Sequence, residues 1–558
     1  MDMLLTGADI ICECLIEQGV DTVFGYPGGA ALNTYDALYK YRDRINHILT
    51  AHEQGASHAA DGYARSTGKV GVVLSTSGPG ATNLVTGIAT ANIDSIPVVA
   101  ICGNVQRELL GKDAFQEVNI SKVVEPITKA SFLVTEMEDL APTIRKAFEI
   151  AQTGRKGPVL IDVPKDITAM KCEFTPMEKF VPDNKGYFDD KNIETALEMI
   201  KEAKRPIIYA GGGIISSDSC EEFVKFAEKI DAPVCCSLMG LGCIPADHPL
   251  FVGNLGMHGG YDTGMATDKA DLIIACGARF SDRVAGNPEK FGEKANIIHL
   301  DIDENEIHKN VKADTFVIGD LKDTFNKLNE GAEKKDNKEW IETVRSWKNQ
   351  VVISDKNPDG YCHPYEILDQ INKIKAREDI VSTDVGQHQM WVAQRTEFFN
   401  PRTFLTSGGL GTMGFGLGAS IGASEGNPDK RVFLVTGDGS FHMNINELVT
   451  LKSYNIPVVV VVMNNSVLGM VRQWQKLFYD NRFSQTNPHR ATDFVEVAKG
   501  YGIKGMRIEK PEEIYDVLKK AYDMNEPVVV DCVISPDENV LPMIPPGKTV
   551  EDIVTSMD

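Results

Sequence analysis

The chain has 558 residues, enough for three or four domains of about 150 residues each. It carries 57 Lys and Arg against 79 Asp and Glu, and the net charge of −22 argues against a nucleic-acid binder or a protein held on anionic lipid. The longest apolar run, Ile456 to Met463, is far shorter than the ~20 residues of a bilayer span. Most cysteines lie in apolar runs without metal or redox spacing, so we expect a cytoplasmic protein with no membrane segment.

Short apolar runs that end in Gly, Pro or Asp alternate with helical stretches along the chain. Thr6 and Asp9 predict a capped amphipathic helix at the start, rather than a signal peptide. Strands buried on both faces are predicted at 70–80, 96–103, 157–164, 205–213, 270–280, 296–303, 379–386, 431–439 and 456–465. This alternation predicts an α/β protein with parallel sheets, whose ligand loops lie at the C-terminal ends of the strands.

Two polar stretches, 172–192 and 330–350, interrupt this pattern. The first is rich in Pro, Asp and Lys, the second is a charged helical stretch, and we interpret both as linkers. They divide the chain into segments at about 1–175, 190–335 and 365–558.

One carboxylate, Glu53, follows a predicted strand that ends near Thr50 in the first third of the chain. Taken alone, it is most simply a solvated glutamate in the first turn of a helix, where the helix dipole favours negative charge. His52 and His58 are six residues apart and do not form a metalloprotease motif. Gly-rich strand ends at 24–30 and 76–83 suit close approach by a ligand or a second subunit.

The most specific pattern lies in the last third, where Gly437-Asp438-Gly439 ends one predicted strand and Asn464-Asn465 ends the next. Loops after neighbouring parallel strands lie side by side, so we expect Asp438 and Asn465 to meet. Mg²⁺ binds such side-chain oxygens together with a backbone carbonyl, water and phosphate oxygens. The pattern therefore predicts a magnesium and diphosphate site.

A formal G-x-G-x-x-G motif runs from Gly409 to Gly414. A nicotinamide dehydrogenase would need an acidic residue about 20 positions further on, and Asp438 fits that spacing only loosely. Asp438 also lies inside the Gly-Asp-Gly pattern and has the Asn-Asn partner, which a ribose-binding acid does not need. The dinucleotide reading is therefore the weaker alternative.

Together these motifs resemble those of thiamine-diphosphate enzymes. The whole chain resembles the catalytic large subunits of the acetohydroxyacid synthase (acetolactate synthase) family, in its FAD-containing biosynthetic branch. The resemblance rests on segments such as YPGGA, AHEQGA, GPGATN, KDAFQE, GPVLIDVPKD, GMHG, GARFSDRVAG, DVGQHQMW, LGTMGFG, GDGSFHMNINEL, MNNSVLGMVRQWQ and VLPMIPPG. It implies three doubly wound parallel-sheet domains: a pyrimidine-binding domain (1–175), a Rossmann-like FAD domain (190–335), and a diphosphate- and Mg²⁺-binding domain (365–558) that resembles the first.

The resemblance also implies which residues bind the cofactors. Those for thiamine diphosphate are Tyr26, Pro27, Gly28, Glu53, Val385, Gly386, Gln387, His388, Gly411, Met413, Gly437, Asp438, Gly439, Ser440, Asn465 and Met470. Those for Mg²⁺ are Asp438, Asn465 and the carbonyl of Val467. Those for FAD are Arg155, Gly211, Gly212, Gly213, Leu255, Gly256, Met257, His258, Gly277, Ala278, Arg279, Asp282, Asp301 and Ile302.

The implied reaction is decarboxylation of pyruvate and ligation of the remaining two-carbon unit to a second 2-keto acid, in branched-chain amino-acid biosynthesis. Pyruvate as acceptor gives 2-acetolactate, and 2-ketobutyrate gives 2-aceto-2-hydroxybutyrate. The catalytic residues would be Glu53 on the pyrimidine N1′, Met413 under the cofactor, Arg283 on the acceptor carboxylate, Trp474, and Phe115, Gln116 and Lys165 from a facing subunit. Read singly, Arg283 would be a surface ion pair and Trp474 a packing residue.

The family implies a homodimer or homotetramer with active sites at the subunit interface, so that Glu53 acts in trans, and a small regulatory subunit. FAD would be structural in this branch. The alternatives within the same family are a flavin-free catabolic acetolactate synthase and a pyruvate oxidase.

Overall fold

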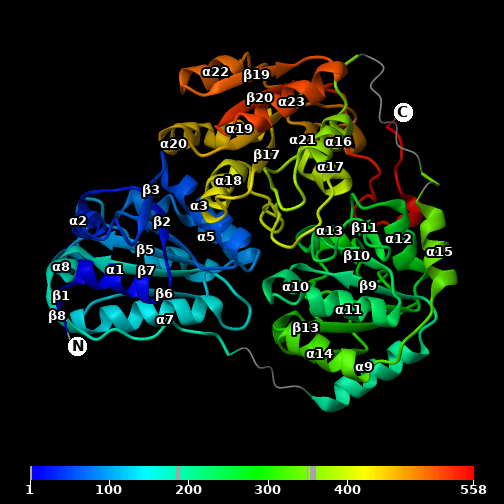
Figure 1. The fold of residues 1–558 in the computed structure, drawn as a ribbon, viewed down its shortest axis with the longest axis horizontal. Coiled ribbons are helices and arrows are strands. Elements are labelled where there is room, and N and C mark those ends of the chain that lie inside the picture. Colours follow the sequence, from blue (N-terminus) through cyan, green and yellow to red (C-terminus); the bar gives the residue numbers. More distant parts are fainter. Residues whose placement is uncertain (1–2, 184–188, 349, 352–359, 558) are drawn as a thin grey trace.

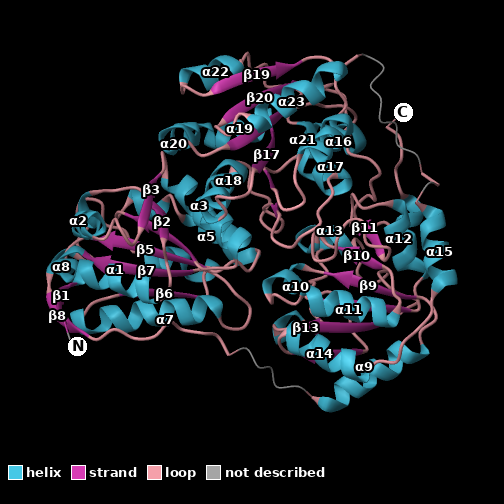
Figure 2. Cartoon of the chain, in the orientation of Figure 1, coloured by secondary structure: helices cyan, strands magenta, loops and turns pink. Residues whose placement is uncertain are grey.

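The computed structural model describes residues 3–183, 189–348, 350–351 and 360–557. Three α/β units follow one another along the chain, coloured blue to cyan, green, and yellow to red in Figure 1. Figure 2 shows the strands of each unit as a layer with helices on either side. Across these described ranges, no helix is long and apolar enough to cross a membrane.

The N-terminal unit is built on a six-stranded parallel sheet with the order β3-β2-β4-β5-β7-β6. Its strands are β2 (Thr22–Gly25), β3 (Asn46–Leu49), β4 (Gly71–Ser75), β5 (Val98–Asn104), β6 (Ala130–Leu133) and β7 (Val159–Pro164). Its helices are α1 (Gly7–Glu17), α2 (Leu32–Lys40), α3 (Glu53–Thr67), α4 (Pro79–Thr82), α5 (Val85–Ile93), α6 (Ile120–Val124), α7 (Leu140–Gln152) and α8 (Lys165–Ala169). Val72 and Val73 on β4 belong to different apolar clusters, so both faces of the sheet are buried, as in other parallel sheets.

The C-terminal unit has a six-stranded parallel sheet with the order β16-β15-β17-β18-β20-β19. Its strands are β15 (Ile380–Thr383), β16 (Phe404–Leu405), β17 (Val432–Gly437), β18 (Val458–Asn464), β19 (Lys504–Ile508) and β20 (Val528–Val533). Its helices are α16 (Pro364–Ile374), α17 (Gln387–Arg395), α18 (Phe415–Gly426), α19 (Asp438–Asn444), α20 (Leu448–Tyr454), α21 (Gly469–Phe478), α22 (Phe494–Gly500) and α23 (Ile514–Asp523). Numbered within each unit, both sheets have the order 2-1-3-4-6-5, so the first and third units share one topology.

The central unit has a different strand order, β11-β10-β9-β12-β13-β14, which is 3-2-1-4-5-6 within the unit. This is the order of the Rossmann dinucleotide-binding fold. Its strands are β9 (Pro206–Ala210), β10 (Val234–Cys236), β11 (Phe251–Asn254), β12 (Leu272–Cys276), β13 (Asn296–Asp301) and β14 (Thr315–Ile318). Its helices are α9 (Asp190–Glu202), α10 (Gly212–Ser216), α11 (Cys220–Ile230), α12 (Tyr261–Lys269), α13 (Asp282–Ala285), α14 (Leu321–Gly331) and α15 (Lys338–Trp347).

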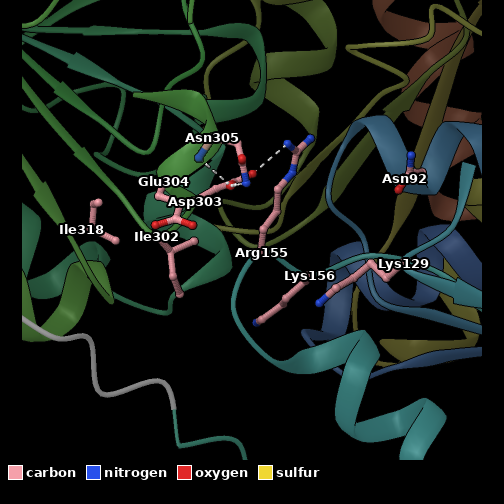
Figure 3. A pocket seen from close by; sticks show the side chains of 9 residues that line it. All are labelled: Asn92, Lys129, Arg155, Lys156, Ile302, Asp303, Glu304, Asn305 and Ile318. Carbon is pink, nitrogen blue, oxygen red and sulfur yellow. Dashed lines mark hydrogen bonds and ion pairs between the residues drawn. The ribbon is translucent and has the colours of Figure 1, made fainter. Parts of the chain in front are cut away.

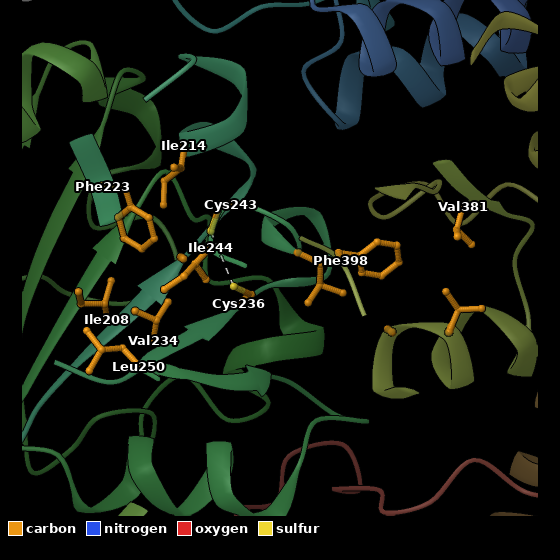
Figure 4. Packing of buried hydrophobic residues seen from close by; sticks show 14 of the residues in the cluster. Ile208, Ile214, Phe223, Val234, Cys236, Cys243, Ile244, Leu250, Val381 and Phe398 are labelled. Carbon is orange, nitrogen blue, oxygen red and sulfur yellow. Dashed lines mark hydrogen bonds between the residues drawn. The ribbon is translucent and has the colours of Figure 1, made fainter. Parts of the chain in front are cut away.

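The three units pack on one another through apolar contacts. One buried cluster runs from the central sheet into the C-terminal unit, and Figure 4 shows Phe398 between the central residues Cys236 and Ile244 and the C-terminal Val381. Helices α3 and α18 pack closely because Gly62 and Gly422 leave no side chain between them. A Cβ on Gly422 would overlap the carbonyl oxygen of Ala59. The first and third units therefore share a core.

The predicted α/β class, the helix that Thr6 caps and each of the nine predicted strands are confirmed. Strands β6, β10, β11, β14, β19 and β20 were not predicted, and neither was the antiparallel pair that follows. Strands β1 (Met3–Thr6) and β8 (Lys171–Phe174) pair as a small antiparallel sheet. The stretch interpreted as the second linker contains α15, whose buried Trp340 donates from Nε1 to the carbonyl of Pro206 at 2.9 Å. The proposed domain limits stay a prediction.

Candidate active site

The Gly-Asp-Gly and Asn-Asn motifs meet at the C-terminal edge of the third sheet. Strands β17 and β18 are parallel neighbours with Gly437 opposite Met463, and α19 begins at Asp438. The backbone N–H of Asn465 donates to the Asp438 carboxylate. The Asn465 side-chain oxygen accepts from the Val467 N–H at 3.1 Å. The three residues predicted to bind a metal are therefore adjacent.

The surroundings of Asp438 fit a cation. Its side chain is buried, and burial raises its pKa to about 6 against the opposing effect of the backbone N–H groups around it. A buried carboxylate of this kind is stabilised in its charged form by a nearby cation. The Asp438 carboxylate, the Asn465 amide oxygen and the Val467 carbonyl are the hard oxygen donors that Mg²⁺ prefers.

A second loop, between β15 and α17, lies against the first. A Cβ built on Gly437 would be 2.8 Å from Nδ1 of His388, so the imidazole lies directly beside the Gly-Asp-Gly turn. The His388 ring is buried, its pKa is lowered by burial to about 3, and its Nε2 has no hydrogen-bond partner within the described residues. Gln387 accepts from the Asn465 side chain at 3.2 Å, which joins the two loops. The neutral ring would not donate from Nε2 to an anion, but a bound diphosphate would favour the protonated ring, whose Nε2–H could then donate to it.

The loop from Gly409 to Gly414 lies alongside these residues. Met413 Cε is 3.9 Å from a Cβ built on Gly439, and the Gly414 N–H donates to the Ser440 hydroxyl at 3.3 Å. Gly411 has φ +69°, a left-handed conformation that favours glycine. The Gly409 N–H, at the start of the motif, is bonded to a carboxylate of the N-terminal unit and is not free to hold a pyrophosphate, which argues against the dinucleotide alternative.

The remaining residues predicted to bind thiamine diphosphate in the C-terminal unit flank these loops. Val385 and Gly386 precede α17, and Met470 is the second residue of α21. A Cβ on Gly469 would overlap Oε1 of Gln387, so α21 begins against the same loop.

Glu53 lies at a different edge, in the N-terminal unit. It is the first residue of α3, is buried, and accepts from the Asn83 side chain at 3.0 Å. Tyr26, Pro27 and Gly28 follow β2 at the same sheet edge, and Tyr26 is exposed. Within the described chain, no hydrogen bond or ion pair joins Glu53 to Asp438 or Asn465. A single chain thus contains two separate groups of predicted residues.

The predicted acceptor residues are brought together only in part. Arg283 on α13 and Trp474 on α21 come from different units, and the guanidinium carbon lies 5.9 Å from the indole ring centre. The Arg283 side chain is 62% exposed and forms an ion pair with the exposed Asp282 at 3.7 Å, which is the surface pairing expected when the residue is read singly. Phe115 is 87% exposed, and Gln116, with φ +60°, packs under Gly78. Lys165 begins α8, and in the part of the chain described these N-terminal residues form no hydrogen bond or ion pair with Arg283 or Trp474.

A cavity of about 560 Å³ lies between the N-terminal and central units (Figure 3). Its lining is Asn92, Lys129, Arg155, Lys156, Ile302, Asp303, Glu304, Asn305 and Ile318. Arg155 bonds to Asp303 at 3.2 Å and to Glu306 at 2.9 Å. Burial and then Arg155 lower the pKa of Lys129 to about 8. These crowded cations would be stabilised by an anionic ligand.

Of the residues predicted to contact FAD, only Arg155 and Ile302 line this cavity. The sequence reasoning missed Asn92, Lys129 and Asp303, and the one available signal was the basic pair Arg155-Lys156. The cavity takes its walls from two units that are distant in sequence.

The other predicted FAD residues lie at the C-terminal edge of the central sheet. A Cβ on Gly211 would overlap the carbonyl of Gly277, so packing of these two turns alone explains the glycines at both positions. His258 offers a better indication of a ligand because it is buried and its Nδ1 has no partner in the described chain. Burial raises the pKa of Asp301 to about 6. The rest of this group is placed as follows: Gly212 and Gly213 start α10, Leu255, Gly256 and Met257 follow β11, Ala278 and Arg279 follow β12, and Asp282 starts α13.

Comparisons with known families agree with this architecture. Residues 5–123, 193–328 and 384–532 match the N-terminal TPP binding, central and C-terminal TPP binding domains of thiamine pyrophosphate enzymes. The fold and the loops at its sheet edges therefore define a thiamine pyrophosphate enzyme.

Among curated relatives, a Methanocaldococcus jannaschii protein named "Probable acetolactate synthase large subunit" is 46% identical over 99% of this chain and 95% of its own length. The acetolactate synthase large subunits of Buchnera aphidicola (from Schizaphis graminum) and Corynebacterium glutamicum are 45% and 43% identical, over 97% and 98% of this chain and 96% and 90% of their own lengths. The chain belongs to the acetolactate synthase large-subunit family.

Proposed function

We propose that the chain is the catalytic subunit of an acetolactate synthase. It decarboxylates pyruvate and joins the two-carbon unit to a second pyruvate or to 2-ketobutyrate, giving 2-acetolactate or 2-aceto-2-hydroxybutyrate. The observation that carries the proposal is the similarity to acetolactate synthase large subunits over nearly the whole chain, including all three domains. No feature of the described chain favours a flavin-free synthase or an oxidase over this reading.

The two loop groups are assigned to the two ends of the cofactor. Asp438, Asn465 and the Val467 carbonyl would hold Mg²⁺, and His388, with the loop before α17, would hold the diphosphate. Glu53 would hold the proton at N1′ of the pyrimidine, and Met413 would support the cofactor from below. When bound, thiamine diphosphate supplies the carbon nucleophile and the electron sink for the loss of carbon dioxide.

The acceptor step is assigned to Arg283 and Trp474. A guanidinium offers two parallel N–H donors to a carboxylate, a geometry that suits a 2-keto acid. Trp474 lies beside Arg283 and would form the apolar wall of the acceptor site. Phe115, Gln116 and Lys165 would complete this site from the facing subunit.

The cavity between the first and second units is assigned to part of FAD. Lys129, Arg155 and Lys156 suit phosphate oxygens, because charge-assisted bonds to such groups are strong. His258 and Asp301 offer further polar partners near the glycine turns. FAD would be structural here, whereas in a pyruvate oxidase the flavin would be reduced and then reoxidised.

The active form is proposed to be a homodimer or homotetramer in which Glu53 serves the partner's cofactor. The support is that Glu53 and Asp438 form no bond within one described chain, and that Phe115 is exposed to an extent unusual for an aromatic side chain. A small regulatory subunit is proposed because the relatives are named large subunits.

Product analysis tests the proposal. Cofactor-free protein is incubated with pyruvate and given thiamine diphosphate, Mg²⁺ and FAD singly and together, while acetolactate and oxygen uptake are followed. We expect acetolactate only when thiamine diphosphate and Mg²⁺ are both present, with no oxygen uptake coupled to pyruvate. Oxygen uptake without acetolactate would identify an oxidase, and full activity without FAD would favour the flavin-free synthase. Sedimentation at low protein concentration measures the oligomeric state.

A further inference from the structure

We propose that Asp94 and Glu447 are positioning residues that form a reciprocal pair of carboxylate clamps. Each belongs to one thiamine-binding unit and holds the site loop of the other unit in the same chain. This inference rests on the proposed function for the meaning of the two loops, and on the hydrogen bonds below for the clamps themselves.

Asp94 extends from the end of α5 in the N-terminal unit into the C-terminal unit. Its side chain is 0% exposed. Its two oxygens accept from the backbone N–H groups of Gly408 and Gly409 at 3.0 and 2.8 Å. Arg65 donates to the same carboxylate at 3.0 Å and also pairs with Asp61. The held glycines begin the loop that carries Gly411 and Met413.

Glu447 makes the same kind of contact in the opposite direction. It lies in the short 3₁₀ helix Ile445–Glu447 of the C-terminal unit and is 0% exposed. Its two oxygens accept from the backbone N–H groups of Ala51 and His52, both at 3.0 Å, and Thr450 donates to it at 2.6 Å. The next residue after this pair is Glu53. Each clamp thus binds two consecutive N–H groups of a site loop.

The two clamps occupy equivalent places in the shared topology. Ala51-His52 and Gly408-Gly409 both lie between the second strand of their sheet and the helix that follows, α3 or α18. Asp94 and Glu447 both lie in the connection between the third and fourth strands. Because α3 packs on α18, the two contacts lie at the junction of the same two units.

A carboxylate suits this task better than a neutral side chain. Hydrogen bonds to a charged acceptor are stronger than neutral ones, and a carboxylate accepts on both oxygens at once. Replacing Glu447 by Gln or Asp94 by Asn keeps the size but turns one acceptor into an NH₂ donor that faces an N–H. The variant therefore loses one of the two bonds at each site without opening a cavity.

Amide hydrogen exchange of the full-length, cofactor-free chain tests the clamps directly. We expect Glu447→Gln to speed exchange at Ala51 and His52, and Asp94→Asn to speed it at Gly408 and Gly409, each by about 10- to 100-fold, equivalent to about 1.4–2.8 kcal/mol. The matched control is Glu425→Gln. Glu425 also crosses between the units, but it accepts from the Asn46 side chain at 3.3 Å and holds no site loop. It should leave both segments unchanged.

Cofactor binding and turnover give a second, independent readout. With Mg²⁺ at saturation, Asp94→Asn should raise the Kd for thiamine diphosphate about tenfold or more, because it frees the loop under the cofactor. Glu447→Gln should leave that Kd within about threefold of the native value and lower kcat about tenfold or more, because it frees the segment that carries Glu53. Glu425→Gln should change neither.

Two glycine variants test the clamps even if the carboxylate variants do not fold. A Cβ on Gly55 would overlap Oε1 of Glu447, and a Cβ on Gly409 would come within 2.8 Å of Oδ1 of Asp94. Gly55→Ala and Gly409→Ala therefore displace the same contacts with every charge kept. Each should reproduce the exchange pattern of the matching carboxylate variant.

Unchanged exchange at both segments in folded Glu447→Gln and Asp94→Asn protein, or in both glycine variants, would overturn the proposal. So would a uniform increase in exchange across the chain, since that reports general destabilisation. The exchange experiment needs neither cofactor nor substrate. If the native chain forms no acetolactate but the segment-specific exchange pattern is observed, the proposed function is rejected and the proposed clamps are supported.

Discussion

Two carboxylates of the candidate site, Glu53 and Asp438, are both buried but are held by different chemistry. Asp438 is surrounded by backbone N–H groups at the start of a helix, which is a place that favours a charged carboxylate beside a metal. Glu53 has a single side-chain donor, Asn83. A bound cation would offset the burial that raises the pKa of Asp438, whereas Glu53 is placed to exchange a hydrogen bond with a ligand.

Glu53→Gln tests this assignment. The variant should bind thiamine diphosphate with little change but lower kcat by about 10²-fold or more, as for a lost acid–base group. Exchange of the C2 proton of bound thiamine diphosphate, followed by NMR, should slow in parallel. Glu339→Gln is the control, because Glu339 is an exposed glutamate in the first turn of α15. An unchanged C2 exchange rate would reject the role of Glu53.

Asp162 is a buried carboxylate outside the site, on strand β7 and opposite Cys102 of β5. Asn104 donates to it at 2.6 Å, its second oxygen has no partner in the described chain, and burial raises its pKa to about 7. The folded state therefore holds a proton that the unfolded chain loses near pH 4. The free energy of unfolding should fall as pH rises from about 4 to about 7. Above that range it should not fall further through Asp162, because the carboxyl is then ionised in both states.

Asp162→Asn removes this titration and keeps the bond to Asn104. Between pH 5 and pH 8 the thermal midpoint of the variant should rise relative to that of the native chain. The difference in unfolding free energy between the two proteins should grow by roughly 2–3 kcal/mol over this range, at about 1.4 kcal/mol per pKa unit. The gap between the two proteins is the quantity to measure, since the other titrating groups are common to both. A gap that does not widen with pH would show that Asp162 does not titrate in this range.

At the scale of elements, the contact between α3 and α18 joins the two thiamine-binding units. Both helices begin at a site loop, so their packing sets the position of Glu53 relative to the loop of Met413. Backbone passes so close to backbone that Gly62, Gly418 and Gly422 have no room for a side chain. The glycines are a packing requirement and not a source of flexibility here.

Gly422→Ala should therefore be destabilising although alanine favours helices. Its Cβ would overlap the carbonyl of Ala59, and forcing such a contact costs about 1–3 kcal/mol. Gly500→Ala is the control, because that glycine ends α22 and a Cβ there meets nothing within 4 Å. The control should be neutral or stabilising by up to about 1 kcal/mol. Thermal midpoints of the two variants should move apart, and a similar midpoint for both would contradict the packing argument.

The elements that could be predicted from sequence are those whose pattern is local. The valine run in β18 predicts a strand buried on both faces. Because β17 and β18 are adjacent and parallel, Asp438 is expected beside Asn465. Strand β10, at three residues, is too short to show such a pattern. Asp94 appears in the sequence only as a residue at the end of a helix, because the two backbone N–H groups that it accepts from lie more than 300 residues further along. The polar cavity was missed for the same reason, since its walls come from two units.

At the scale of the whole molecule, the candidate site draws on all three units. The first and third contribute the two groups of residues predicted to bind thiamine diphosphate, and they share one strand order. The central unit contributes Arg283, which meets Trp474 of the third unit across a domain boundary. The proposed acceptor position would therefore be formed by assembly of the units, because its two residues come from different ones.

Arg283→Lys tests whether that position serves the second substrate. Lysine keeps the charge but loses the planar, two-donor contact with a carboxylate. The loss should cost about 1.5–3 kcal/mol in the acceptor step, or about 10- to 150-fold in rate. Decarboxylation uses Glu53 and the cofactor residues, so it should change much less. Carbon dioxide release should then outrun ligation, and acetaldehyde should accumulate relative to acetolactate in one incubation with pyruvate.

If both products fall together at a fixed ratio, Arg283 does not hold the acceptor. It would then act by keeping the central and C-terminal units together, and the thermal midpoint of the variant would fall as well.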